Sequence, residues 1–293
     1  MYAIKPNSES GMPDLRRKLY EALWAPQVKP MLERVPLVRR IYGGWARVHP
    51  FDATHGVDTS GFAAAAECAG ESAGGVGLAA QISPYGGSQP SIVRSGLASL
   101  PDPQRYAFVD IGCGKGRPLV VASEFPFPRV VGVELAPRLA AIARANAAIV
   151  AARHPDRTPI EVQVGDATAV SPPADRVVYF MYHAFNDALV GALIDNLERQ
   201  LRDRLQHAFF VYYNPVHGDV LDRSPRFVRW SAQTIPYAPD ELGYGPDIQD
   251  TLVIWQSVPE RYPTRAGAGR RIAASPSQSC SLGESPLIGG RVF

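Results

Sequence analysis

The stretch from Phe108 to Arg117 holds the residues of this chain that are best suited to binding a ligand. Asp110 lies near the end of a hydrophobic run and is followed by glycines on alternate positions: Gly112, Gly114 and Gly116. Glycine permits backbone angles and a closeness of approach that a side chain forbids. Such a turn between a strand and a helix can place a nucleoside-bearing ligand over the helix N-terminus. The stretch therefore predicts a nucleoside-binding turn.

The spacing of these glycines argues against a dinucleotide. That pattern, Gly-x-Gly-x-x-Gly or Ala, would need a small residue at position 117, where Arg117 stands. The side chains of Lys115 and Arg117 could meet a carboxylate of the ligand. They could equally be solvated or paired with acidic residues of the chain.

Two further acids close the next two hydrophobic runs. Glu134 lies 24 positions after Asp110, near the offset of about 20 residues at which a carboxylate binds a ribose. A carboxylate can accept hydrogen bonds from two neighbouring hydroxyls, and we expect Glu134 at an exposed strand end. Asp166 ends an alternating run that starts at Ile160. On its own, Asp166 could also cap the following turn.

The ends of the fourth and fifth hydrophobic runs carry candidates for proton transfer. Tyr182 and His183 end the fourth run, and an imidazole can take up a proton near neutral pH. The alternative is a strand-end histidine bonded to the backbone. Tyr213 and Asn214 could orient a substrate through hydrogen bonds, and His217 is a weaker candidate base.

These residues need a sheet to bring them together. Buried strands that alternate with helices over 118–123 and 137–148 predict an α/β fold. The last two strands, 227–235 and 250–256, have no crossover helix between them, so they should pair antiparallel. We predict a Rossmann-like, seven-stranded, mostly parallel sheet with an antiparallel terminal strand and helices on both faces.

The Asp-x-Gly-x-Gly-x-Gly pattern, followed by acids at the next two strand ends, resembles the class I S-adenosylmethionine (SAM)-dependent methyltransferases. Its Gly-Lys-Gly-Arg version, with the upstream Asp58-Thr-Ser-Gly and the Tyr85 turn, looks like an uncharacterised bacterial subset. That subset is distantly similar to the histone-lysine methyltransferases that do not use the SET fold. The resemblance implies SAM as cofactor and methyl transfer to a small molecule or a protein side chain.

The resemblance also implies roles for individual residues. Glu134 would bind the ribose, Asp166 the adenine amino group, and the backbone after Asp166 the adenine ring. Tyr85 and Gln89 would touch the cofactor. The alternative is that Tyr85 packs within a turn and that Gln89 is a polar residue at the start of a helix. The full set expected at the cofactor is Tyr85, Asp110, Gly112, Gly114, Gly116, Glu134, Leu135, Asp166 and Ala167.

The chain departs from one branch of the family at the fourth strand end. Methyltransferases that act on amino groups of bases carry Asn/Asp-Pro-Pro-Tyr/Phe there, whereas this chain has the sequence 182–186, Tyr-His-Ala-Phe-Asn. This difference argues against base methylation. Two other functions stay open at this point: a nicotinamide-dependent Rossmann oxidoreductase, and a non-catalytic partner subunit of the SAM-binding fold.

Composition is that of an ordinary globular protein, with 46% hydrophobic and 20% charged residues among 293. A net charge of +2 gives no strong signal for nucleic acid. The three cysteines are widely spaced, so we expect neither a metal site nor disulfides, and reduced thiols favour a cytoplasmic location. We see neither a transmembrane run nor a secretory signal.

The sequence suggests three parts. Residues 1–60 would form a helical and loop extension, with a helix over 13–24 that covers the core or, alternatively, lies on a membrane surface or an acidic partner. Its segment 49–61 should be a shaped loop. Residues 61–258 would form the SAM-binding domain, and the Gly-, Ser- and Pro-rich tail 259–293 would be disordered. The oligomeric state is left open.

Overall fold

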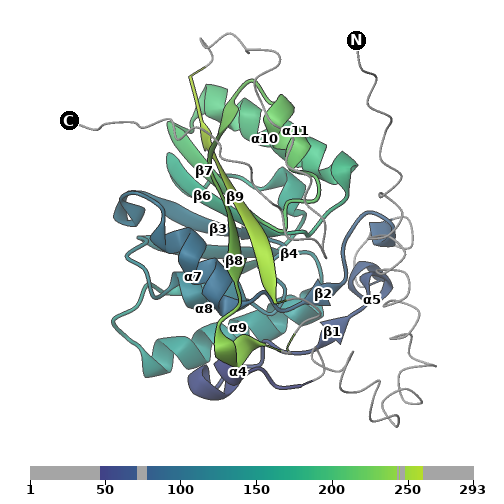
Figure 1. Ribbon diagram of the computed structural model, residues 1–293, viewed down its shortest axis with the longest axis vertical. Helices are drawn as coiled ribbons and strands as arrows, with labels where there is room; N and C mark the ends of the chain where they lie inside the picture. Colours follow the sequence, from purple (N-terminus) through teal and green to yellow (C-terminus); the bar gives the residue numbers. More distant parts are fainter. Residues whose placement is uncertain (1–46, 71–77, 243, 245–247, 260–293) are drawn as a thin grey trace.

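A computed structural model describes residues 47–70, 78–242, 244 and 248–259 of this protein. The helix expected over 13–24 and the tail from residue 260 onward lie outside these ranges. A seven-stranded sheet forms the centre of the described part (Figure 1). Its strands are β3 (Ala107–Ile111), β4 (Arg129–Glu134), β5 (Ile160–Val164), β6 (Arg176–Tyr182), β7 (His207–Tyr213), β8 (Phe227–Pro236) and β9 (Gln249–Ser257).

The strand order is β5-β4-β3-β6-β7-β9-β8. Strands β3 to β7 pair in parallel, and β9 runs antiparallel to both β7 and β8. The predicted fold, including its antiparallel last strand, is confirmed. The chain winds outward in one direction from β3 and in the other from β6, so the topological switch point lies between these two strands. Ligands of open α/β sheets bind at such a point, beyond the carboxyl ends of the strands.

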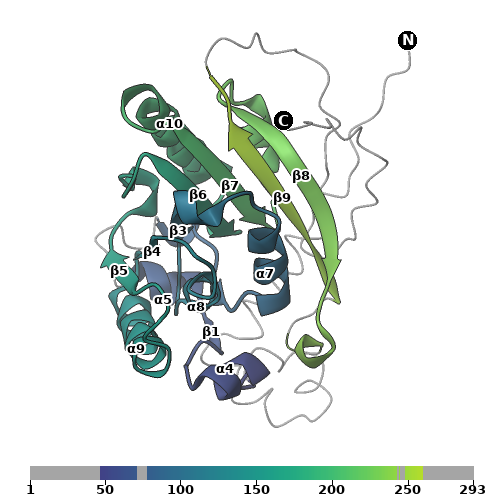
Figure 2. The same ribbon diagram turned by 90° about the vertical axis from the view of Figure 1, so that its left-hand side faces the viewer.

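Helices cover both faces of the sheet (Figures 1 and 2). On one face α7 (Pro90–Ala98) and α8 (Arg117–Ala122) pack into a core with inward-facing residues of β3 and β6, such as Phe108 and Phe180. On the other face α10 (Asp187–Asp203) and α11 (Gly218–Arg223) pack into a second core, which holds Val109 and Tyr179. Neighbouring residues of a strand point to opposite faces, so both cores share each strand. Helix α9 (Pro137–Arg153) packs along β4 and β5.

The described residues that precede α7 contain short elements that the sequence did not predict. Segment 49–61, expected as a loop, includes the six-residue helix α4 (Pro50–His55). The ring of His49 accepts a hydrogen bond from the Phe51 N–H at its start, and Gly56, with a φ of 68°, ends it. Six residues are too few to show a hydrophobic period. Beyond it lie β1 (Phe62–Ala63), α5 (Ala65–Gly70) and β2 (Tyr85–Gly86), the last within the predicted turn.

Two kinds of feature are absent from the ranges that the structure describes. No helix in them combines the length and the apolar character that crossing a membrane requires. No group of three or more His, Cys, Asp or Glu side chains in them is arranged to hold a metal ion.

Candidate functional site

The glycine turn joins β3 to α8 at the switch point. Gly112, Gly114 and Gly116 have φ values of 72°, 54° and 85°, which L side chains rarely adopt. The N–H groups of Gly112 and Cys113 donate to the carbonyl oxygen of Val133, at 2.9 and 3.0 Å, so the turn is bound to β4. Each of the three positions therefore has the backbone conformation for which the sequence predicted that glycine is needed.

Tyr85 lies directly over the middle of this turn. A Cβ atom at Gly114 would come within 2.3 Å of the Tyr85 ring. The tyrosine hydroxyl donates to the carbonyl oxygen of Thr59 at 2.7 Å, which holds the ring in place. The structure thus brings Tyr85 to the predicted site. Gln89 instead is buried, bonds to the ring of His49 and precedes helix α7, which is the alternative that the sequence left open.

Glu134 closes β4 and binds the turn through its carboxylate. Oε2 accepts from the N–H of Gly114 at 2.7 Å, and Oε1 accepts from the N–H of Ala136 at 2.9 Å. The residue is only 7% exposed, so the expectation of an exposed strand end is wrong. Glycine has no side chain to keep the two strand ends apart, and the carboxylate therefore folds back onto the turn.

Asp110 is buried one residue before the end of β3, and its Oδ2 has no hydrogen-bond partner among the described residues. Burial, and then the nearby charge of Glu134, raises the pKa of Asp110 well above its usual range. A buried polar atom without a partner is unfavourable, so this carboxyl is suited to a polar group that a ligand brings.

Asp166 follows β5 and is exposed. Its Oδ1 accepts from the N–H of Thr168 at 2.8 Å and from the Thr168 hydroxyl at 2.7 Å, so it caps the short helix η4 (Ala167–Ala169). Gly165 donates to the carbonyl oxygen of Glu134 at 3.0 Å, which keeps this strand end beside β4. The capping role that the sequence left open is present, and a role toward adenine stays a prediction.

The two remaining members of the predicted cofactor set lie near these acids. Ala167 is buried in the core that α10 covers, and Leu135 is partly buried against the same core. Three of the strands that carry predicted residues, β5, β4 and β3, are direct neighbours in the sheet. Because these strands are parallel, the predicted cofactor residues at their carboxyl ends lie at the same end of the sheet.

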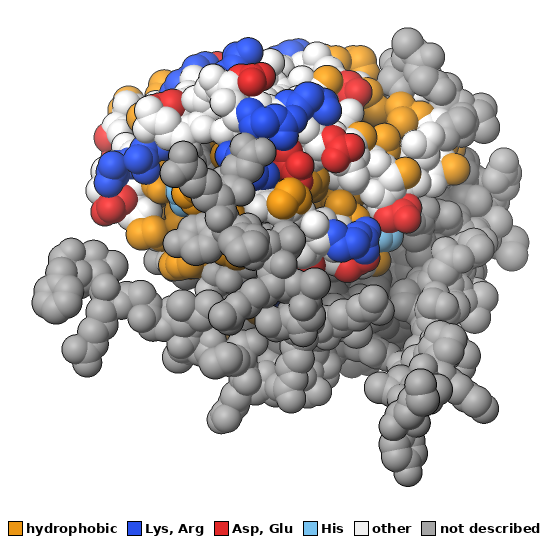
Figure 3. Space-filling view, turned by 90° about the horizontal axis from the view of Figure 1, so that it is seen from above, with side chains coloured by type: hydrophobic (Ala, Val, Ile, Leu, Met, Phe, Trp, Pro, Cys, Tyr) orange, Lys and Arg blue, Asp and Glu red, His pale blue; other side chains and the backbone are white. Residues whose placement is uncertain are grey.

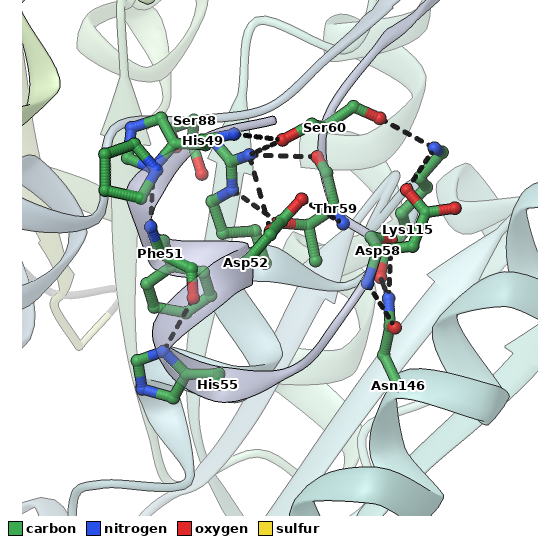
Figure 4. A network of polar contacts seen from close by, with 12 residues as sticks. His49, Phe51, Asp52, His55, Asp58, Thr59, Ser60, Ser88, Lys115 and Asn146 are labelled. Carbon is green, nitrogen blue, oxygen red and sulfur yellow. Dashed lines mark hydrogen bonds and ion pairs between the residues drawn. The ribbon is translucent and has the colours of Figure 1, made fainter. Parts of the chain in front are cut away.

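The cations of the turn bind the N-terminal segment, and Figure 4 shows Lys115 reaching Asp58 and Ser60. Lys115 Nζ donates to Asp58 Oδ1 at 2.8 Å and to the Ser60 carbonyl at 2.6 Å. Arg117, which is 3% exposed, donates to Thr59 and Ser88. The alternative of pairing within the chain is therefore the one observed. Sequence reasoning missed this arrangement because its partners lie 29 to 58 residues upstream.

The neutral ring of His49 completes this region. Burial, and then the charge of Arg117, lowers the pKa of His49 to about 4. At neutral pH the ring is therefore uncharged: Nδ1 accepts from the N–H of Phe51 at 3.0 Å, so Nε2 carries the proton and donates to Gln89 Oε1 at 3.2 Å.

The residues predicted to act on the substrate lie on the other side of the switch point, at the ends of β6 and β7. The Tyr182 ring stacks on Tyr213, with centroids 4.2 Å apart, and Tyr213 donates to Asp250 at 2.7 Å. His183 and Asn214, which follow β6 and β7, have φ values of 37° and 50°. Backbone in this region is uncommon for residues other than glycine, although His and Asn adopt it more readily than most, and it is enriched at functional sites.

Two histidines face each other beyond these strands. The ring centroids of His183 and His217 are 6.0 Å apart. The strand ends therefore bring together the two bases that the sequence singled out. Phe185, which follows them, is buried in the core.

Residues 108–204, from β3 to the end of α10, match the model of a protein family that is described as a methyltransferase domain. Residues 108–204 are a methyltransferase domain. The resemblance seen in the sequence is thus confirmed, and SAM is the cofactor of this domain. No curated protein matches the sequence of the chain.

Solved structures with a similar arrangement have low identities to this chain. An RNA methyltransferase from Salinibacter ruber in complex with S-adenosylhomocysteine is 19% identical over 60% of this chain and 96% of its own, with a TM-score of 0.37. TrmN from Thermus thermophilus is 16% identical over 58% and 49%, with a TM-score of 0.42. The SMU.472 protein in complex with S-adenosylhomocysteine is 13% identical over 56% and 52%, with a TM-score of 0.40, so this chain spans about half its length. These values are too low to indicate an acceptor.

The methyltransferase domain has residues that fit this cofactor. The partnerless Oδ2 of Asp110 can form a hydrogen bond with a polar group of the ligand, and the Glu134 carboxylate lies near it at the glycine turn. These groups lie on one side of the switch point, and the histidines and tyrosines lie on the other.

Proposed function

We propose that this protein transfers a methyl group from SAM to a small molecule or a protein side chain. The observation that carries the proposal is the position of the glycine turn, Asp110 and Glu134 at the switch point of a methyltransferase domain, next to the strand ends that carry Tyr182 and His183. A cofactor and an acceptor bound on the two sides of one switch point would lie close together.

In this proposal the turn and the acids hold the cofactor. Glu134 binds the ribose, the carboxylate of Asp166 accepts from the adenine amino group, and the backbone at Ala167 borders the ring. Tyr85 covers the turn at Gly114. When bound, SAM supplies a methyl group that its positively charged sulfonium already activates. The main task of the chain is then to hold the acceptor in line, which can account for a large part of the rate.

His183 takes the proton of an acceptor that arrives protonated. Its place beyond β6, its unusual backbone and the neighbouring ring of His217 support this role. Tyr182 borders the acceptor, and its stacking on Tyr213 fixes the plane of its ring. Because Tyr213 donates to the partly buried carboxyl of Asp250, the pair is anchored in the sheet.

Charge on the described surface supports a small or protein acceptor rather than a polyanion. In the view from above, basic and acidic side chains are interspersed (Figure 3). Several arginines are paired with acids, as Arg229 is with Asp222 and Arg223 with Asp219. The Tyr-His-Ala-Phe-Asn sequence after β6 also lacks the proline pair of the enzymes that methylate bases.

Two measurements test the proposal. Calorimetric titration with SAM and separately with NAD should give heat with SAM, and heat with NAD alone would contradict it. Incubation with methyl-labelled SAM and a cell lysate, split into protein, nucleic-acid and metabolite fractions, should then label the protein or the metabolite fraction. Label confined to nucleic acid would show that the acceptor class is wrong.

A further inference from the structure

Arg117 occupies an unusual place for a cationic side chain. It begins helix α8 directly after Gly116, and only 3% of it is exposed. A buried guanidinium is unfavourable unless its N–H groups find acceptors. Asp52, the carboxylate with which it pairs, lies 3.9 Å away, too far for a hydrogen bond. The groups that accept hydrogen bonds from Arg117 therefore indicate the role of this side chain.

Two of the atoms that accept hydrogen bonds from Arg117 belong to Thr59, a residue that Figure 4 labels. Nε donates to Thr59 Oγ1 at 2.7 Å and Nη2 to the Thr59 carbonyl at 3.0 Å, while Nη1 donates to the Ser88 carbonyl at 2.9 Å. This planar, forked pattern requires arginine, because a lysine ammonium is a point donor. Arg117 thus fixes the start of α8 to one residue of the N-terminal segment.

Thr59 is in turn held on every side. It is fully buried, its N–H donates to Asp52 Oδ2 at 2.9 Å, and its hydroxyl donates to Asp52 Oδ1. Its carbonyl accepts from Tyr85 as well as from Arg117. The residue therefore connects the two side chains that border the glycine turn: Tyr85 over Gly114, and Arg117 after Gly116.

A second set of bonds holds the middle of the turn. Lys115 Nζ bonds to Asp58 and Ser60, and its side chain is 13% exposed. From α9, the Asn146 amide accepts from the N–H of Asp58 at 2.8 Å and donates to the carbonyls of Asp58 and Lys115, at 2.8 and 2.9 Å. Residues 58–60 are thus bonded to both sides of Gly116.

We propose that residues 58–60, which we call the clasp, are positioning residues that hold the glycine turn in its cofactor-binding shape through Arg117 and Lys115. The proposal rests on the proposed function. A turn with three glycines has many accessible shapes, and ordering it on binding would weaken affinity for SAM. A turn that is already ordered avoids this loss. The clasp touches the turn and not the reacting atoms, so its effect is on cofactor affinity.

The test compares three variants with the wild type. Thr59→Val removes the hydroxyl that links Asp52 and Arg117, Thr59→Ser keeps it, and Lys115→Met removes the second set of bonds. Arg129→Met is the matched control, because Arg129 forms an exposed ion pair with Glu161 at the opposite end of β4. For each, the dissociation constant for SAM is measured by calorimetry, and hydrogen exchange of the amides of 112–116 is measured without SAM.

We expect Thr59→Val to raise the dissociation constant for SAM by at least about tenfold and to speed amide exchange in 112–116. Lys115→Met should do both to a smaller extent, and Thr59→Ser and Arg129→Met should match the wild type. A folded Thr59→Val protein with wild-type exchange and affinity would overturn the proposal. If Thr59→Val does not fold, Lys115→Met decides in the same way.

The two readouts separate this proposal from the proposed function. If the wild type does not bind SAM, the proposed function fails, while the exchange rates of 112–116 still show whether the clasp orders the turn. If the wild type binds SAM tightly but amide exchange in 112–116 is the same in Thr59→Val as in the wild type, only the clasp proposal is rejected.

Discussion

The carboxylate of Glu134 accepts the backbone N–H of Gly114 at 2.7 Å. The acid that ends β4 is thus bonded to the middle residue of the turn that follows β3. One side chain therefore shapes the turn and, in the proposed function, also binds the ribose. A change at this position should affect both stability and cofactor affinity, which the next variant tests.

Glu134→Gln replaces one of two acceptor oxygens by an amide donor, which faces a buried N–H group of Gly114 or Ala136. We expect the free energy of unfolding to fall by about 1–3 kcal/mol, and SAM affinity to fall about tenfold or more. Urea unfolding and calorimetry measure the two effects. Glu161→Gln, on the exposed pair with Arg129, is the control. Unchanged SAM affinity would show that the ribose role is wrong.

Gly114→Ala should disrupt the turn. Its φ of 54° is unfavourable for alanine, and the added Cβ would lie 2.3 Å from the Tyr85 ring. We expect a loss of more than about 1 kcal/mol in unfolding free energy and a strong loss of SAM binding. Gly191→Ala in α10 is the matched control, because no atom lies within 4 Å of the added Cβ. It should stabilise the protein by about 0.5–1 kcal/mol and leave SAM binding unchanged; equal behaviour of the two variants would contradict the prediction.

His183→Ala should lower turnover far more than cofactor affinity. Loss of a general base typically lowers kcat by about 10²-fold or more, whereas the SAM dissociation constant should stay within about twofold. Steady-state kinetics with the acceptor found by methyl labelling, together with calorimetry, measures both. His217→Ala is the comparison, since its ring faces that of His183, and a smaller loss is expected there. An equal loss of turnover and SAM affinity in His183→Ala would point to a structural role.

Glu124 should make stability depend on acid pH. Burial acts to raise its pKa, but the hydrogen bonds from Arg94 and His55 outweigh burial and lower it to about 2, from an ordinary 4.5. Its contribution, up to about 3 kcal/mol, is therefore complete above pH 4.5 and is lost as pH falls from 4.5 toward 2. Urea unfolding across this range should show the loss in the wild type and a flatter dependence in Glu124→Gln. Parallel curves for the two proteins would refute the assignment.

The sheet and the positions of the acids near the ends of its strands could be predicted from the sequence. Strands β3 and β4 are continuous hydrophobic runs, and their ends are marked by Asp110 and Glu134, so local pattern was enough. The glycines of the turn were predictable because positive φ leaves few alternatives. The sequence could not show that Glu134 is buried, since this depends on how closely the turn approaches β4.

The surroundings of Arg117 could not be predicted. Its acceptors are the hydroxyls of Thr59 and Ser60 and two backbone carbonyls, which every residue has, and they lie far upstream in the chain. The six residues of α4 are too few for a periodic signal. The stacking of Tyr182 on Tyr213 depends on β6 and β7 being neighbours in register, which follows from the sheet and not from either run alone.

The connection between Arg117 and Thr59 bears on how this protein can be divided. The family match begins at residue 108, yet the acceptors of Arg117 come from residues 59, 60 and 88. A chimera that transplants only 108–204 into another scaffold would carry an arginine to its interior without acceptors. Proteins shortened step by step from the N-terminal side should thus lose affinity for the cofactor well before the deletion reaches the strand β3.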